Sequence, residues 1–254
     1  MTAALTSPHN PLLKEVRRAA SKGELTADGC VVAEGLHLLE EALASPVEIV
    51  TVIVSDAART AAESLLSRTQ ARLVSVPEAV FSKIASTEHP QGVITLVRPR
   101  QWSPKDLLGG TPLIVILDAI QDPGNAGTIV RTAEAFGATG VVFLKGTVSP
   151  HNPKCLRASA GSLFRMPLIH DFSPAIMPDL ALYAAMPRAE RTLDQADLTR
   201  PCAIAVGSEG RGVGPGTAAL ATHVRIPTVG VESLNAAMAA GVMLYEAHRQ
   251  RTRA

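Results

Sequence analysis

Three glycine-rich stretches decide the fold of this chain: LDAIQDPGNAGTIVRTAEAFGA at 117–138, AIAVGSEGRGVG at 203–214 and RIPTVGVESLNAAMAAG at 225–241. Each begins with a short apolar run that is typical of a strand and continues into a turn rich in Gly, Pro, Asn or Ser. Ligands of α/β proteins bind at turns that follow the carboxyl ends of strands. The polar side chains of these segments are Asn125, Arg131, Glu209, Ser233 and Asn235. The three turns together therefore predict a functional site.

The C-terminal half alternates between predicted strands and predicted helices. The strands are expected at 113–119, 140–146, 166–172 and 201–208, and the helices at 128–137, 154–162 and 176–185. Such alternation predicts a mainly parallel sheet. Arg131 is expected one turn inside the first helix, and Ser233 is expected to cap the apolar helix that follows it. That last helix is apolar nearly all round, which predicts burial in the core or in a subunit interface.

The N-terminal part predicts a smaller αβ sandwich of its own. Helices are expected at 10–21, 36–45, 57–68 and 76–86, with strands at 30–35, 47–55, 71–76 and 92–99. Between the two parts, residues 99–112 hold three prolines and two glycines, a composition that suits neither a helix nor a central strand. We therefore expect an N-terminal domain at 1–98, a linker at 99–112 and a catalytic domain at 113–254.

Composition excludes several classes of protein. The chain has 254 residues and 46% hydrophobic content, enough for two modest domains, and its net charge of +1 permits only a local basic surface. Aromatic residues make up 3%, too few for a base-stacking platform. The three cysteines are widely spaced and without metal-ligand spacing, which predicts a reducing compartment and no metal site. The sequence contains neither the apolar region of a signal peptide nor an apolar stretch long enough to span a membrane, so we expect a cytoplasmic protein.

The three motifs, DPGNAGTIVRTAEAFGA, GSEGRGV and IPTVGVESLNAAMAAG, resemble those of the SpoU/TrmH family of RNA ribose 2′-O-methyltransferases, in the SPOUT class. The N-terminal VVAEGLHLLEEAL and EHPQGVITLV are similar to the substrate-binding domain that rRNA-modifying members carry. The resemblance implies an α/β catalytic domain with a trefoil knot and a mainly parallel sheet. It also implies a homodimer formed through that domain, with S-adenosylmethionine as cofactor.

The resemblance assigns roles to individual residues. The catalytic positions would be Arg131, Asn125, Glu209, Ser233 and Asn235. The positions around the cofactor would be Gly207, Ile226, Leu234, Pro227 and Gly230. Nucleotide triphosphate use is unsupported, because GSEGRGVG has neither the dinucleotide pattern nor the end of a phosphate loop.

Plainer interpretations of the same residues stay open. Arg131 lies three residues before Glu134 and so could be a surface ion-pair partner. Glu209 could be a solvated carboxylate, and helix capping alone could explain Ser233. An arginine is also a poor base because its pKa keeps it protonated, so a guanidinium could instead stabilise the developing alkoxide or hold a phosphate.

Basic residues suggest where RNA would bind. No acidic residue occurs between Glu134 and Asp171, a stretch that also contains Lys145. The candidate RNA-binding residues are Lys154, Arg157 and Arg165 in that stretch, and Lys14, Arg17 and Arg18 in the first helix. A solvated surface is the alternative for both groups.

We therefore expect a methyltransferase that modifies a ribose 2′-hydroxyl, with rRNA favoured as substrate because of the N-terminal domain. A tRNA 2′-O-methyltransferase and an inactive RNA-binding or ribosome-assembly protein of the same fold are the alternatives. An enzyme that confers antibiotic resistance through rRNA methylation would have much the same sequence.

Overall fold

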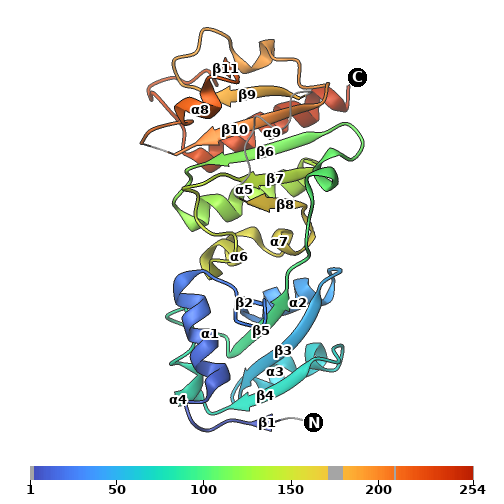
Figure 1. Ribbon diagram of the computed structural model, residues 1–254, viewed down its shortest axis with the longest axis vertical. Helices are drawn as coiled ribbons and strands as arrows, with labels where there is room; N and C mark the ends of the chain where they lie inside the picture. Colours follow the sequence, from blue (N-terminus) through green and yellow to red (C-terminus); the bar gives the residue numbers. More distant parts are fainter. Residues whose placement is uncertain (1–2, 171–179, 209, 254) are drawn as a thin grey trace. The chain divides into compact units, whose positions relative to one another are not determined.

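The computed structural model describes residues 3–170, 180–208 and 210–253 (Figure 1). The chain folds into two compact units. The first contains Met1–Gln101 and Ser149–Arg165, and the second contains Trp102–Val148 and Met166–Ala254. Within the described residues, no helix combines the length and the apolar character needed to cross a membrane.

The first unit is a five-stranded mixed sheet with helices. In chain order its elements are β1 (Ala3–Ala4), α1 (Pro11–Lys22), β2 (Val31–Glu34), α2 (Leu36–Leu43), β3 (Glu48–Ser55), α3 (Arg59–Leu66), β4 (Arg72–Val76), α4 (Glu78–Phe81), β5 (Val93–Arg98), α6 (Pro153–Ser159) and α7 (Ser162–Arg165). The strand order is β1-β4-β3-β5-β2, in which β5 runs antiparallel to both neighbours. α1 starts sharply because Asn10 caps it and Pro11 fixes its first turn.

The segment 149–165 packs with the first unit although it separates two strands of the second. Leu156 of α6 and Phe164 of α7 are buried in one cluster with Val31 and Val97. Gly161 between the two helices has a φ of 87°, and a Cβ there would collide with Glu41. The apolar pattern of the segment could not reveal which of the two cores it would join. The predicted domain limits stay a prediction. The structure adds that segment 149–165, which was predicted within the catalytic domain, packs with the first unit.

The second unit has a six-stranded parallel sheet in the order β11-β9-β10-β6-β7-β8. Its strands are β6 (Leu113–Asp118), β7 (Gly140–Phe143), β8 (Leu168–His170), β9 (Ala181–Ala185), β10 (Cys202–Gly207) and β11 (Thr222–Val224). Its helices are α5 (Pro123–Ala135), α8 (Pro215–Ala218) and α9 (Ala236–Arg251), with 3-10 turns at Pro104–Leu108 and Leu193–Gln195. The smaller sheet of the first unit and this parallel sheet confirm the predicted α/β fold class. The trefoil knot stays a prediction from the resemblance.

The structure differs from the sequence-based expectation in three places. Residues 181–185 form β9 instead of the end of a helix, because they pair with β10 and β11, while 176–179 lie outside the described residues. α5 begins at Pro123, five residues before the predicted start, because Asp122 caps it. The expected linker contains a 3-10 helix closed by Ser103 and Asp106, and its Leu107 is fully buried.

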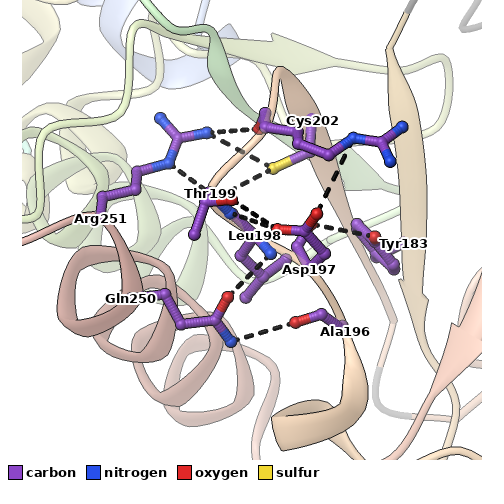
Figure 2. Close-up of polar contacts among 9 residues, drawn as sticks. Tyr183, Ala196, Asp197, Leu198, Thr199, Cys202, Gln250 and Arg251 are labelled. Atoms are coloured by element: carbon purple, nitrogen blue, oxygen red, sulfur yellow. Dashed lines mark hydrogen bonds and ion pairs between the residues drawn. The ribbon is translucent and has the colours of Figure 1, made fainter. Parts of the chain in front are cut away.

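The end of α9 is fixed to the amino ends of the central strands (Figure 2). Arg251 donates hydrogen bonds to the carbonyl oxygens of Leu198, Thr111, Pro112 and Arg200 at 2.8 to 2.9 Å. Gln250 accepts from the Leu198 amide and donates to the Ala196 carbonyl. The last turn of α9 therefore donates to backbone carbonyls that precede β6 and β10, including that of Pro112, which also accepts from the Cys202 amide.

Candidate functional site

The two central strands end together, and the candidate site lies at that edge. Asp118, the last residue of β6, is in register with Gly207, the last residue of β10. Because all strands of this sheet are parallel, their carboxyl ends share one edge, where ligands bind in open α/β sheets. The three glycine-rich turns predicted from the sequence all follow strands of this sheet.

The loop after β10 folds back over its own strand. The Gly212 amide donates to the Ser208 carbonyl at 2.7 Å, and the Gly214 amide donates to the Asp118 carboxylate at 3.0 Å. Gly207 is required at this point because a Cβ there would lie 1.9 Å from the carbonyl carbon of Gly212. Asp118 is a buried residue that the sequence reasoning missed. An aspartate that ends an apolar strand was the available signal.

Two helices begin at the site, and a side chain at the start of one is bonded to a side chain in the first turn of the other. Asp122 caps α5 by accepting from the Asn125 amide at 2.7 Å. Asn235 caps α9, since its Oδ1 accepts from the amides of Ala237 and Met238. Its Nδ2 then donates to Oδ1 of Asn125 at 3.2 Å. The expected cap at Ser233 was wrong, because Asn235 holds that position. Both helix amino ends bring partial positive charge to the site.

A cavity of about 600 Å³ opens beside these helices. It is lined at the strand ends by Ala185, Val206, Gly207 and Val224, and by Ile226, Ser233 and Leu234 of the loop before α9. Its volume falls in the range of small-molecule sites, about 300 to 1,000 Å³. The walls combine apolar side chains with backbone that glycine leaves accessible, which suits a ligand with both apolar and polar parts.

A smaller cavity of about 270 Å³ adjoins the first. Its lining includes Gln121, Asp122 and Asn125 from the start of α5. Ser208, Gly210, Arg211 and Ala236 line both cavities. A ligand in one cavity would therefore be next to a ligand in the other.

The structure brings many of the predicted site residues together. The smaller cavity is lined by Asn125, and the larger one by Gly207, Ile226, Ser233 and Leu234. Asn235 lines neither cavity but is bonded to Asn125, which lines the smaller one. Pro227 and Gly230 line neither cavity, and Glu209 lies outside the described residues. Sequence reasoning missed Arg211, which the loop carries to the boundary between the cavities.

Arg131 is an exposed residue of α5 and lines neither cavity. Within the described residues, no hydrogen bond or ion pair holds its guanidinium, so the pair with Glu134 that was the alternative interpretation does not form. Its side chain is therefore available to a ligand or a second molecule. Its catalytic role stays a prediction from the motif.

Three of the predicted RNA-binding arginines have carboxylate partners. Arg18 contacts Glu15 at 2.8 Å and Glu24 at 2.5 Å, and its hydrogen bonds lower the pKa of Glu15 to about 2. Arg165 donates to Glu41 at 2.6 Å. Arg157 donates to the hydroxyl of Ser86 at 2.9 Å and lies 3.9 Å from Glu34.

These partners reduce what the three arginines can offer to phosphate, and the role of all six candidates in RNA binding stays a prediction. Lys14, Arg17 and Lys154 are exposed.

Comparison with known proteins gives a consistent result. A crystal structure of an AdoMet-bound rRNA methyltransferase from Sinorhizobium meliloti superposes with a TM-score of 0.83 and 29% identity, covering 98% of both chains. An uncharacterised tRNA/rRNA methyltransferase of Synechocystis is 38% identical, over 98% of this chain and 94% of its own. The 23S rRNA (guanosine(2553)-2′-O)-methyltransferase RlmP of Bacillus subtilis is 32% identical, over 95% and 97%.

Two family models match the chain. Residues 112–245 match the SpoU rRNA methylase family, and residues 10–95 match the MRM3-like substrate-binding domain. The chain belongs to the SpoU rRNA methylase family. The resemblance drawn from the three motifs and from the N-terminal sequence is therefore confirmed.

Proposed function

We propose that this protein transfers the methyl group of S-adenosylmethionine to a ribose 2′-hydroxyl of rRNA. The observation that carries the proposal is the pair of adjoining cavities at the carboxyl edge of the parallel sheet. One has the size and lining of a cofactor site, and the other borders it with amide side chains. Family membership and the AdoMet-bound relative support the same chemistry.

The larger cavity fits S-adenosylmethionine. Val206, Ile226 and Leu234 would hold the apolar part of the cofactor, and the backbone near Gly207 would offer it polar groups. When bound, S-adenosylmethionine supplies an electrophilic methyl group: the ribose oxygen forms a bond to the methyl carbon, the carbon–sulfur bond breaks with its electrons going to sulfur, and the hydroxyl proton passes to water. Among the described residues, no group of three or more His, Cys, Asp or Glu side chains is placed to hold a metal ion.

The protein's part is to orient the ribose and stabilise charge on its oxygen. Asn125 lines the smaller cavity, and its bond to Asn235 fixes its orientation. Alignment of this kind contributes more to transfer rates than any single acid or base. Arg131 is the proposed essential residue, and because a guanidinium stays protonated we assign it charge stabilisation or phosphate contact in preference to proton abstraction.

The N-terminal unit is the basis for choosing rRNA. Its sequence matches a substrate-binding domain, and RlmP, which is similar over nearly its whole length, is a 23S rRNA enzyme. Ribose methylation mapped in rRNA and tRNA, from cells with and without the gene, tests the choice. We expect one mark to be lost from rRNA. A mark lost from tRNA would establish the tRNA alternative, and no lost mark would favour an inactive RNA-binding protein.

Cofactor binding can be measured separately. Purified protein should bind S-adenosylmethionine or its demethylated product in a calorimeter without metal or ATP. An affinity that vanished on adding a chelator would contradict the proposed site.

We also propose a homodimer formed through the second unit. Met238 and Tyr245 are 62% and 55% exposed on α9, and they lie on the same side of the helix because seven residues make nearly two turns. Large exposed apolar side chains that share a helix face are typical of an interface. Analytical ultracentrifugation should give twice the chain mass, and Met238→Glu should shift the protein toward a monomer.

A cytoplasmic location completes the proposal. Cys30, Cys155 and Cys202 are all buried and form no disulfide, as expected for a protein of a reducing compartment. Fractionation of cells with an antibody to the chain would test this, and enrichment in the membrane or extracellular fraction would contradict it.

A further inference from the structure

Arg211 stands between the two cavities. It is an exposed residue of the loop that follows β10, and it contributes to the wall of both the larger and the smaller cavity. Within the described part of the chain, no carboxylate or carbonyl accepts a hydrogen bond from its guanidinium. By contrast, Arg18 and Arg251 are both held by protein acceptors. A charged side chain without a protein partner at a cavity border is available to a ligand.

The loop holds the backbone near Arg211 in place. The Gly212 amide is bonded to the Ser208 carbonyl, and the Gly214 amide is bonded to the Asp118 carboxylate. The loop lies directly against its own strand at Gly207, where any side chain would collide with Gly212. These two bonds hold Gly212 and Gly214 over the strand, and Arg211 next to them lines both cavities.

We infer that the smaller cavity receives the acceptor nucleotide and that Arg211 binds one of its backbone phosphates. The inference rests on the proposed function, because the methyl acceptor must occupy space that borders the methyl donor. At about 270 Å³ the smaller cavity is below the usual range for drug-sized ligands, which suits one sugar and its phosphate. A phosphate flanks every ribose of RNA, and a guanidinium binds phosphate through two parallel hydrogen bonds.

The remaining wall agrees with this orientation. Asn125 and Gln121 offer amide groups to a sugar, whereas Asp122 is a carboxylate that would repel a phosphate. Asp122 is occupied as the cap of α5. The phosphate is therefore expected on the Arg211 side of the cavity and the ribose on the Asn125 side.

Arg211→Ala tests the inference in the full-length protein, with large-subunit rRNA from cells that lack the gene as the probe. We expect the KM for rRNA to rise about tenfold, as for the loss of one charge-assisted contact, while the Kd for S-adenosylmethionine stays within about twofold. Loss of a single phosphate contact should also lower the slope of log affinity against log salt concentration by about 0.7 to 0.9. A residue that only supported the loop would not change that slope.

Two further variants sharpen the measurement. Arg211→Lys keeps the charge but not the two-pronged geometry, so it should retain the salt slope and show an intermediate KM. Arg191→Ala removes another exposed arginine of the same unit that lines neither cavity, and it should leave both quantities unchanged.

The outcomes are distinguishable from failure of the proposed function. An unchanged rRNA affinity and salt slope in Arg211→Ala would overturn the inference, and so would an equal weakening of S-adenosylmethionine binding. Affinity for rRNA is measured without turnover. A wild-type protein that bound rRNA without methylating it would therefore contradict the proposed function, while the comparison with Arg211→Ala would still decide the role of Arg211.

Discussion

The parallel sheet of the second unit has two edges, one at the amino ends and one at the carboxyl ends of its strands. They differ in how many of their polar groups are hydrogen-bonded within the protein. At the amino ends of the strands, Arg251 and Gln250 bond to backbone groups around β6 and β10. At the carboxyl ends, the turns surround two cavities, and the guanidinium of Arg211 has no protein partner in the described residues.

Helix α9 connects these two edges. Its first turn is capped by Asn235 at the cavities, and its last turn carries Arg251 at the opposite edge. The comparison shows that one edge supplies stability while the other keeps polar groups available for ligands. Substitutions at the two edges should therefore separate loss of activity from loss of stability.

The largest effect should come from Arg131→Ala. We expect methyl transfer to fall by about 10² to 10⁴-fold, because a group that stabilises charge in the transition state is lost. Affinity for S-adenosylmethionine should stay within a few-fold, since Arg131 lines neither cavity. Transfer of labelled methyl to rRNA and calorimetry measure the two quantities. Arg131→Lys should fail as well, and a lysine variant with near-normal activity would indicate a simple charge role.

Arg251→Ala should affect the opposite property. It removes the guanidinium donor from the carbonyls of Leu198, Thr111 and Arg200, so we expect the free energy of unfolding to fall by about 2 to 3 kcal/mol. Denaturant titration measures this, and the protein that remains folded should methylate normally. Arg253→Ala removes an exposed arginine two residues away and is the control. Equal stabilities of the two variants would contradict the structural role of the Arg251 contacts.

Asn235 both stabilises a helix and contacts a residue of the candidate site. Asn235→Ala removes a helix cap and should cost about 1 kcal/mol of stability together with part of the activity. Asn235→Asp keeps an oxygen for the amides of Ala237 and Met238 but loses the donor to Asn125. The aspartate variant should therefore retain most of the stability and still lose activity. Unfolding and methyl transfer measured on both variants would separate the two roles, and a fully active aspartate variant would show that the bond to Asn125 is dispensable.

The sequence predicted the parts of the site that depend on local chemistry. Glycine turns after apolar strands indicated where the cavities lie, and Asn125, Gly207 and Leu234 line them. The positions of these turns could be predicted because turn residues and strand ends are determined over a few neighbouring positions, while the roles of the site residues stay predictions.

The remaining features depend on contacts between distant residues. The stretch 181–185 consists of residues with good helix propensity, such as alanine and leucine, yet pairing with β10 and β11 makes it a strand. Leu156 and Phe164 are apolar in a pattern that suits either core, and their packing against Val31 was not encoded locally. Ser233 and Asn235 are both good capping residues, and only the position where α9 begins shows that Asn235 is the cap.

The smallest expected effect lies at the stable edge and depends on pH. Arg249 donates two hydrogen bonds to the Glu246 carboxylate, both at 2.7 Å, and they hold its pKa below the ordinary value of 4.5. Because the folded pKa is lowered, the contribution of this carboxylate to stability is complete above about pH 4.5 and is lost as the pH falls through the lowered pKa. Glu246→Gln should therefore be less stable than the wild type by up to about 1 kcal/mol at pH 7, and the two should converge in acid. Denaturant unfolding of both proteins between pH 7 and 3 measures the difference. A gap that stayed constant over this range would show that the charge of Glu246 does not stabilise the end of α9.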